Sequence, residues 1–147
     1  MLQILNNQIQ CEPLVDVINN YAFLDDLKEA IDEYMFDNKQ RTIINGEPID
    51  VFYVSGLAEH HHDALADYLN STVLKPTNNR TELSEGCFAD FPVQHYWLKL
   101  GDIIIDITIK QFSDKHIDLS DKLKQLLDHQ YFICDNPANL FYQLYKY

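Results

Sequence analysis

The chain has 147 residues, 46% of them hydrophobic, which predicts one ordered domain, residues 1–147, with a core of its own. Its 11 basic and 23 acidic residues give a net charge of -12, which excludes nucleic-acid binding through a basic face. No apolar run approaches the ~20 residues of a membrane span and no signal-peptide pattern opens the chain, so we expect a cytoplasmic protein that does not enter a membrane.

The first part of the chain predicts two helices separated by a β-turn. Residues 13–36 are expected to be helical. Four apolar side chains recur there at helical spacing, namely Leu24, Leu27, Ile31 and Met35. Two β-rich runs flank Asn45-Gly46, a pair that favours a tight hairpin turn. Residues 57–70 return to the helical period.

The rest of the chain predicts strands followed by helices. Four strands are expected, at residues 71–74, 87–91, 93–100 and 103–109. A loop over residues 75–86 follows the first of them. Two helices are expected at the end, over residues 121–130 after an N-cap at Ser120 and over residues 136–147. This order predicts an α+β fold in which an antiparallel β-meander packs against helices.

The hairpin over residues 95–112 carries the clearest functional signal. A turn at Gly101-Asp102 would place Leu98 opposite Ile105. One face of the hairpin is then apolar and belongs to the core, and it carries Tyr96, Leu98, Leu100, Ile103, Ile105 and Ile107.

The opposite face of this hairpin brings a histidine and an aspartate together. It carries His95, Trp97, Lys99, Ile104, Asp106 and Thr108. His95 and Asp106 become diagonal neighbours, about 7–8 Å apart along the backbone and within side-chain reach. A carboxylate so placed holds an imidazole in one tautomer and stabilises the imidazolium that forms when the ring takes a proton from a nucleophile. The pair predicts nucleophilic catalysis if a nucleophile lies within reach.

The spacing of polar and aromatic residues along the hairpin resembles a known pattern. "HYW" and "IIDITIKQF" fit the signature H-x-W…D-x-T-x-x-Q-F of small bacterial and phage members of the papain-like and transglutaminase-like cysteine hydrolases. The resemblance is strongest over residues 93–112 and extends weakly back to residue 53. It implies a papain-like or transglutaminase-like core, thiol-dependent acyl chemistry on a protein or peptide carbonyl, and no cofactor.

Ala58 occupies the position that the resemblance assigns to the nucleophile. In that superfamily the nucleophilic cysteine stands at the N-terminus of a helix, where the helix dipole lowers the pKa of the thiol and free amides form an oxyanion hole. The matching helix here holds no cysteine. The resemblance therefore implies a nucleophile at position 58, His95 as general base and then acid, and Asp106 as the residue that orients His95.

Three explanations for Ala58 stay open. It is an engineered replacement of a natural cysteine, or the nucleophile was lost naturally and the chain binds without catalysing, or another residue is the nucleophile. Cys87 is the first candidate in the third case, because a turn before His95 could fold it back beside the imidazole. Ser55 is the weaker candidate.

Other residues receive supporting roles. Trp97 would wall the site, and Gln111 would brace the aspartate or the end of its strand. The histidines at 60–62 point about 100° apart on a helix and lack H-x-x-x-H spacing, so no metal site is predicted and a His/Asp metal hydrolase is the weakest alternative. Cys11 and Cys134 fit no CxxC pattern and are interpreted as structural.

The competing class of function is a non-catalytic acidic interaction protein. An immunity or inhibitor domain, or a pseudoenzyme, would use the net charge of -12 to bind a basic protein partner. Salt separates the two classes. An electrostatic complex weakens as salt rises, whereas acyl chemistry needs the His–Asp pair and a thiol at any salt concentration.

Overall fold

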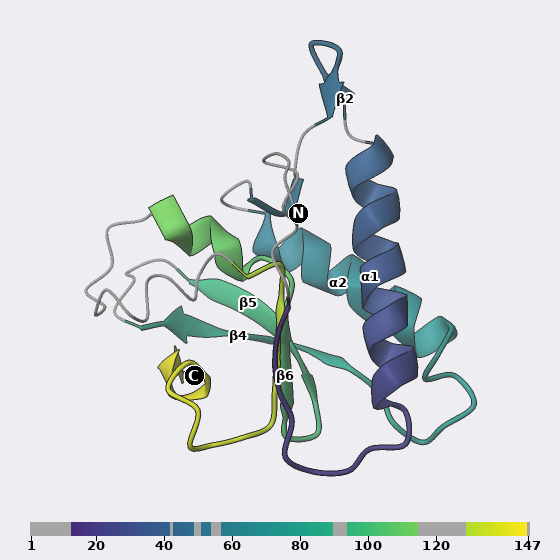
Figure 1. The fold of residues 1–147 in the computed structure, drawn as a ribbon, viewed down its shortest axis with the longest axis vertical. Coiled ribbons are helices and arrows are strands. Elements are labelled where there is room, and N and C mark those ends of the chain that lie inside the picture. The colour runs from purple at the N-terminus through teal and green to yellow at the C-terminus, as the bar shows by residue number, and fades with distance from the viewer. Residues whose placement is uncertain are drawn as a thin grey trace, which may run out of the picture.

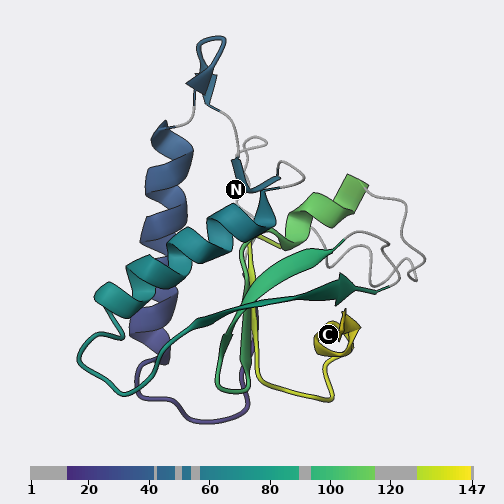
Figure 2. The ribbon, with the colours of Figure 1, turned by 180° about the vertical axis from the view of Figure 1, so that it is seen from behind.

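A six-stranded sheet carries the fold, with two α-helices on one of its faces (Figures 1 and 2). The computed structural model describes residues 13–41, 43–48, 51–53, 57–89, 94–114 and 129–146. Within these ranges the α-helices are α1 (Leu24–Arg41) and α2 (Ala58–Ser71). The strands of the sheet are β1 (Leu14–Asp16), β4 (Glu82–Phe88), β5 (His95–Leu100), β6 (Ile103–Asp106), β7 (Phe132–Cys134) and β8 (Tyr145–Lys146).

The sheet is mixed, with the strand order β1-β7-β6-β5-β4-β8. Its centre, β4 through β7, is antiparallel, and β8 also runs antiparallel to β4, whereas β1 runs parallel to β7. The expected α+β class and the antiparallel β-meander are confirmed. The sheet as a whole is mixed rather than antiparallel, because β1 pairs in parallel with β7 at one edge. A separate hairpin of β2 (Ile43–Ile44) and β3 (Glu47–Pro48) lies beyond the end of α1 (Figure 1).

The helix expected over residues 13–36 forms only in part. α1 begins at Leu24, and its apolar stripe of Leu27, Ile31 and Met35 is fully buried, as predicted. The residues before it form β1 instead, in parallel pairing with β7. Pairing with a strand near the other end of the chain overrides the weak helical pattern of this short segment.

Two further segments differ from the strands predicted for them. The Asn45-Gly46 turn is confirmed, with φ of 55° and 80°, and a type I′ hairpin turn needs two such positive values. The run after this turn leads into the 3-10 helix η2 (Val51–Tyr53) rather than a strand. Residues 71–74 end α2 in turns, because the carbonyl of Leu69 accepts two of their backbone amides.

The closing helix expected over residues 136–147 is wrong. The side chains of Asn136 and Asn139 accept backbone amides two residues ahead, which holds the chain in turns. The chain then passes through the 3-10 helix η5 (Tyr142–Leu144) into β8.

The remaining boundaries move by several residues. The loop expected over residues 75–86 is shorter, because β4 already begins at Glu82. The strand expected over residues 103–109 ends early and leads into the 3-10 helix η3 (Ile109–Asp114). β7 was not predicted. The helix expected over residues 121–130 lies outside the described residues except for its last two positions.

Side chains bury both faces of the centre of the sheet in separate clusters. The helix-side cluster joins α1 and α2 to the apolar face of the predicted hairpin, including Leu98, Leu100, Ile103, Ile105 and Ile107. The aromatic cluster covers the opposite face and consists of Phe88, Ala89, Trp97, Ile104, Ile109, Phe112, Phe132, Cys134, Phe141 and Tyr145. Because both faces are covered, every residue of β6 is buried.

Candidate functional site

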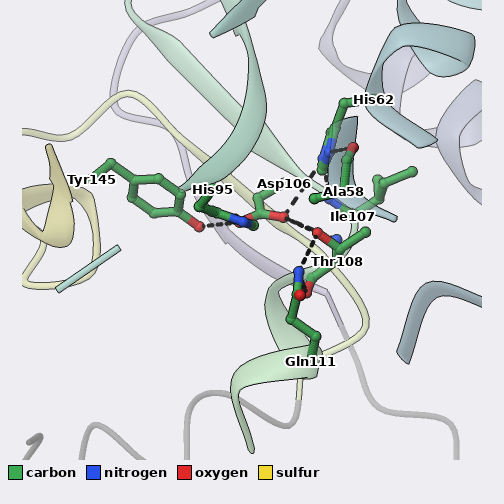
Figure 3. Close-up of polar contacts among 8 residues, drawn as sticks. All are labelled: Ala58, His62, His95, Asp106, Ile107, Thr108, Gln111 and Tyr145. Carbon is green, nitrogen blue, oxygen red and sulfur yellow. Dashed lines mark hydrogen bonds and ion pairs between the residues drawn. The ribbon is translucent and has the colours of Figure 1, made fainter. Parts of the chain in front are cut away.

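The hairpin of β5 and β6 brings His95 and Asp106 together. The strands pair in the predicted register, with Leu98 opposite Ile105. Nε2 of His95 lies 2.8 Å from Oδ2 of Asp106 (Figure 3). The prediction that these two side chains meet is confirmed.

The pair is buried in the aromatic cluster rather than spread over an exposed strand face. His95 is 2% exposed and Asp106 is 0% exposed. Four aromatic rings have centroids within 6.3 Å of the imidazole centroid, and they belong to Phe88, Trp97, Phe112 and Tyr145. Exclusion of water strengthens the electrostatic attraction between the ring and the carboxylate.

Asp106 is the centre of the hydrogen-bond network. Its Oδ2 also accepts the hydroxyl of Tyr145 at 2.7 Å, and its Oδ1 accepts the amide and hydroxyl of Thr108 at 2.9 and 3.2 Å. Burial alone would raise the pKa of this carboxyl. The charge and hydrogen bond of His95, with smaller contributions from His62 and Tyr145, outweigh burial and bring the pKa to about 2. Asp106 is therefore ionised at neutral pH.

The ionised carboxylate decides which nitrogen of His95 carries a proton. A carboxylate only accepts hydrogen bonds, so Nε2 of His95 must be the donor. In the neutral ring Nδ1 then keeps its lone pair, and among the described residues the hydrogen bond of this imidazole is made through Nε2. In this tautomer Nδ1 is the nitrogen of His95 that carries the lone pair.

His62 belongs to the network around Asp106, whereas the sequence favoured only a solvated or pocket-lining place for the histidines at 60–62. Its Nε2 accepts the amide of Ile107 at 2.9 Å, and its Nδ1 lies 2.9 Å from the carbonyl of Ala58, to which it donates. This side chain is fully buried on α2, and burial is the main cause that lowers its pKa to about 4. Its position three residues before the buried Leu65 is the sequence signal that would have placed it on the inner face.

His62 and Asp106 are close but do not form an ion pair at neutral pH. Nε2 of His62 lies 3.6 Å from Oδ1 of Asp106. That nitrogen already accepts the Ile107 amide, so it carries no proton, and the lowered pKa agrees with a neutral ring. The ring therefore connects α2 to the end of β6 without adding a charge.

Ala58 begins α2 and lies beside this network. It is buried, and its carbonyl is linked through His62 to the amide that follows Asp106 (Figure 3). The preceding residue, Leu57, makes no side-chain cap for the helix. The first amides of a helix have no acceptor within the helix, so the start of α2 presents donors that the helix itself does not use.

The described cysteines are placed less favourably for catalysis with His95. Gly86 pairs with His95 across β4 and β5, so the next residue, Cys87, points to the opposite face of β4 from the imidazole. Cys134 is buried in β7, and burial raises the pKa of its thiol to about 12. Cys11 and Ser55 lie outside the described residues.

Trp97 and Gln111 both lie near the pair, Trp97 against His95 and Gln111 against Thr108. Trp97 is fully buried, and its ring centroid lies 5.8 Å from that of His95, as a wall of the site would. The amide of Gln111 donates to the carbonyl and hydroxyl of Thr108 at 3.1 and 3.0 Å. Gln111 therefore braces Thr108, which in turn binds Asp106.

The three histidines at 60–62 lie on different sides of α2. His60 is exposed, whereas His61 packs on Phe52 with ring centroids 4.8 Å apart and His62 enters the network. Within the described ranges, no group of three His, Cys, Asp or Glu residues is arranged to hold a metal ion.

Comparison of the chain with family models, with curated proteins and with solved structures gives no significant match. None of the helices in the described part of the chain combines the length and apolar character needed to cross a membrane.

The buried, neutral His62 predicts a loss of stability in acid. In the unfolded chain this histidine binds a proton as the pH falls through 6.5, whereas in the folded chain it stays neutral down to about 4. The free energy of unfolding should therefore fall between pH 6.5 and pH 4, by about 3 kcal/mol from this residue. The titration of Asp106 adds to this only at lower pH, from 3.8 towards 2.

His62→Gln tests this, because glutamine can still accept from Ile107 and donate to Ala58 but does not titrate. Urea unfolding of both proteins between pH 8 and pH 4 should show a shallower decline for the variant. Parallel declines would mean that His62 is not the group responsible.

Proposed function

We propose that this chain carries the site of a thiol-dependent acyl hydrolase or transferase whose nucleophile position is occupied by Ala58. The observation that carries the proposal is the buried hydrogen bond between Nε2 of His95 and Asp106, which leaves Nδ1 as the basic nitrogen. The resemblance of residues 93–112 to the papain-like and transglutaminase-like signature agrees with it. As written, the chain would bind an acyl substrate without turning it over, because a methyl group cannot attack a carbonyl.

A cysteine at position 58 would complete the chemistry. Its thiol proton would pass to Nδ1 of His95, and the thiolate would attack the carbonyl carbon of an amide, isopeptide or glutaminyl group. Free amides at the start of α2 would hold the oxyanion, and the imidazolium would return the proton to the leaving amine. Water or a second amine would then release the acyl group from sulfur. Asp106 would stabilise the imidazolium throughout without itself taking the proton.

Two contacts support position 58 as the nucleophile. The carbonyl of Ala58 is bound by His62, and the same ring binds the backbone amide next to Asp106. The first turn of α2 is thereby tied to the end of β6, where the carboxylate lies. Cys87 is exposed on β4, and no hydrogen bond among the described residues ties it to the carboxylate, so it is the weaker candidate.

Ala58→Cys should create a thiol of lowered pKa. Iodoacetamide labelling at residue 58, followed by peptide mass spectrometry over a pH series, should show a midpoint well below the pKa of an ordinary thiol, which is about 8.5. Glu59→Cys is the matched control, because it places a thiol in the same helical turn but on an exposed position. It should share any effect of the helix dipole and lack the effect of His95.

The double variant Ala58→Cys with His95→Gln decides the question. The midpoint at residue 58 should return to that of the Glu59→Cys control. If the two variants that each add one cysteine label alike at the added residue, or if the lowered midpoint survives the loss of His95, then the His–Asp pair is not half of a thiol site.

A second candidate function, binding of a basic protein partner, is favoured by the outer face of α1. Six carboxylates on this helix are exposed, those of Asp25, Asp26, Glu29, Asp32, Glu33 and Asp37. Phe36 lies among them in sequence and is 62% exposed. A surface that joins negative charge to an exposed aromatic ring suits a basic protein segment with an apolar contact.

Charge reversal on α1 and, separately, on α2 distinguishes binding at the outer face of α1 from attraction by the net charge of the whole chain. Glu29→Lys with Glu33→Lys should weaken binding of a lysine-rich peptide more than Asp63→Lys with Asp67→Lys on α2. All four residues are exposed, the spacing is the same, and both pairs change the net charge equally. Binding should also weaken as salt rises. Equal losses for the two pairs would show that only overall charge is felt, and α1 would not be a binding face.

A further inference from the structure

The segment Phe141–Lys146, here called the C-terminal strap, crosses the aromatic face of the sheet. Figures 1 and 2 show it on the side of the sheet opposite to α1. It passes through η5 and ends in β8, which pairs with Cys87 and Phe88 of β4. The amide of Ala89 donates to the carbonyl of Leu144 at 2.8 Å and extends this attachment.

Tyr145 joins the strap to the His95–Asp106 pair. Its ring lies parallel to that of Phe132, with centroids 5.6 Å apart, and meets Trp97 edge-on at 5.0 Å. Its hydroxyl donates to Oδ2 of Asp106 at 2.7 Å, and the same oxygen accepts Nε2 of His95 at 2.8 Å. Two donors on one oxygen restrict rotation of the carboxylate, so the hydroxyl of Tyr145 helps hold the acceptor for His95 in place.

Gly86 is the residue that lets the strap approach. It lies opposite His95 in the pairing of β4 with β5. A methyl group added at this position would overlap the carbonyl oxygen of Lys146 and lie 2.9 Å from Cη2 of Trp97. Any larger residue would therefore push β8 away from the sheet, and only glycine permits the close approach of the two backbones.

We propose that Tyr145 is a positioning residue of the His95–Asp106 site, and that the C-terminal strap closes this site through the glycine at position 86. The catalytic meaning of this positioning role rests on the function proposed above. Without the hydroxyl of Tyr145, Oδ2 of Asp106 keeps one donor, and the carboxylate gains freedom to turn away from His95. Release of the strap would also uncover the aromatic cluster around the imidazole.

The test compares two tyrosines of the same strap. Tyr145→Phe removes the hydroxyl that reaches Asp106 and keeps the ring. Tyr142→Phe is the matched control, because the hydroxyl of Tyr142 donates to the carbonyl of Asp102 at 2.9 Å, away from the pair. The readout is the rate at which the Nε2 proton of His95 exchanges with water, measured by NMR on the otherwise unaltered chain. Tyr145→Phe should raise this rate roughly tenfold, and Tyr142→Phe should leave it unchanged.

Gly86→Ala supplies a variant in which every residue of the hydrogen-bond network keeps its own side chain. It should raise the same exchange rate by displacing β8, and the fluorescence of Trp97, the single tryptophan, should shift as the aromatic cluster opens. Equal exchange rates in the two tyrosine variants would overturn the proposal, as would a Gly86→Ala protein with the exchange rate of the parent chain.

The result is independent of the test at position 58, because it needs no nucleophile. If Tyr145→Phe has its expected effect while Ala58→Cys labels as an ordinary thiol, the strap positions the pair but the pair does not serve a thiol. If the reverse holds, the thiol site stands and the strap proposal falls.

Discussion

The buried carboxylate of Asp106 is the group on which the rest of the site depends. A charge with no exposed surface is strongly unfavourable unless it is paired and hydrogen-bonded. Its donors come from three places in the chain, which are His95 on β5, Tyr145 on β8 and Thr108 just after β6. The need to satisfy one charge therefore ties the centre of the sheet to its C-terminal edge.

The carboxylate also lies between two layers with different roles. On the helix side His62 is neutral, with its proton on Nδ1, and joins the start of α2 to the end of β6. On the aromatic side His95 carries its proton on Nε2 and has Nδ1 as the basic nitrogen. One imidazole therefore holds structure while the other has the tautomer that proton transfer requires.

Local pattern was enough to predict the hairpin and the meeting of His95 with Asp106, because the Gly101-Asp102 turn and strict alternation leave one register. It was not enough to predict β1 or β8, since each pairs with a strand far away in sequence and has only a few residues of its own. Tyr145 was missed for that reason, and with it the cover that turns a polar strand face into a buried site.

The most direct measurement is the protonation state of the two imidazoles, read from nitrogen-15 NMR of the ring nitrogens in mildly alkaline solution, where neutral rings report their tautomer. We expect opposite tautomers, with His95 protonated on Nε2 and His62 on Nδ1. A proton on Nδ1 of His95 would contradict this expectation, because Nε2 could then not donate to Asp106 and the basic nitrogen would be the one already occupied by the carboxylate.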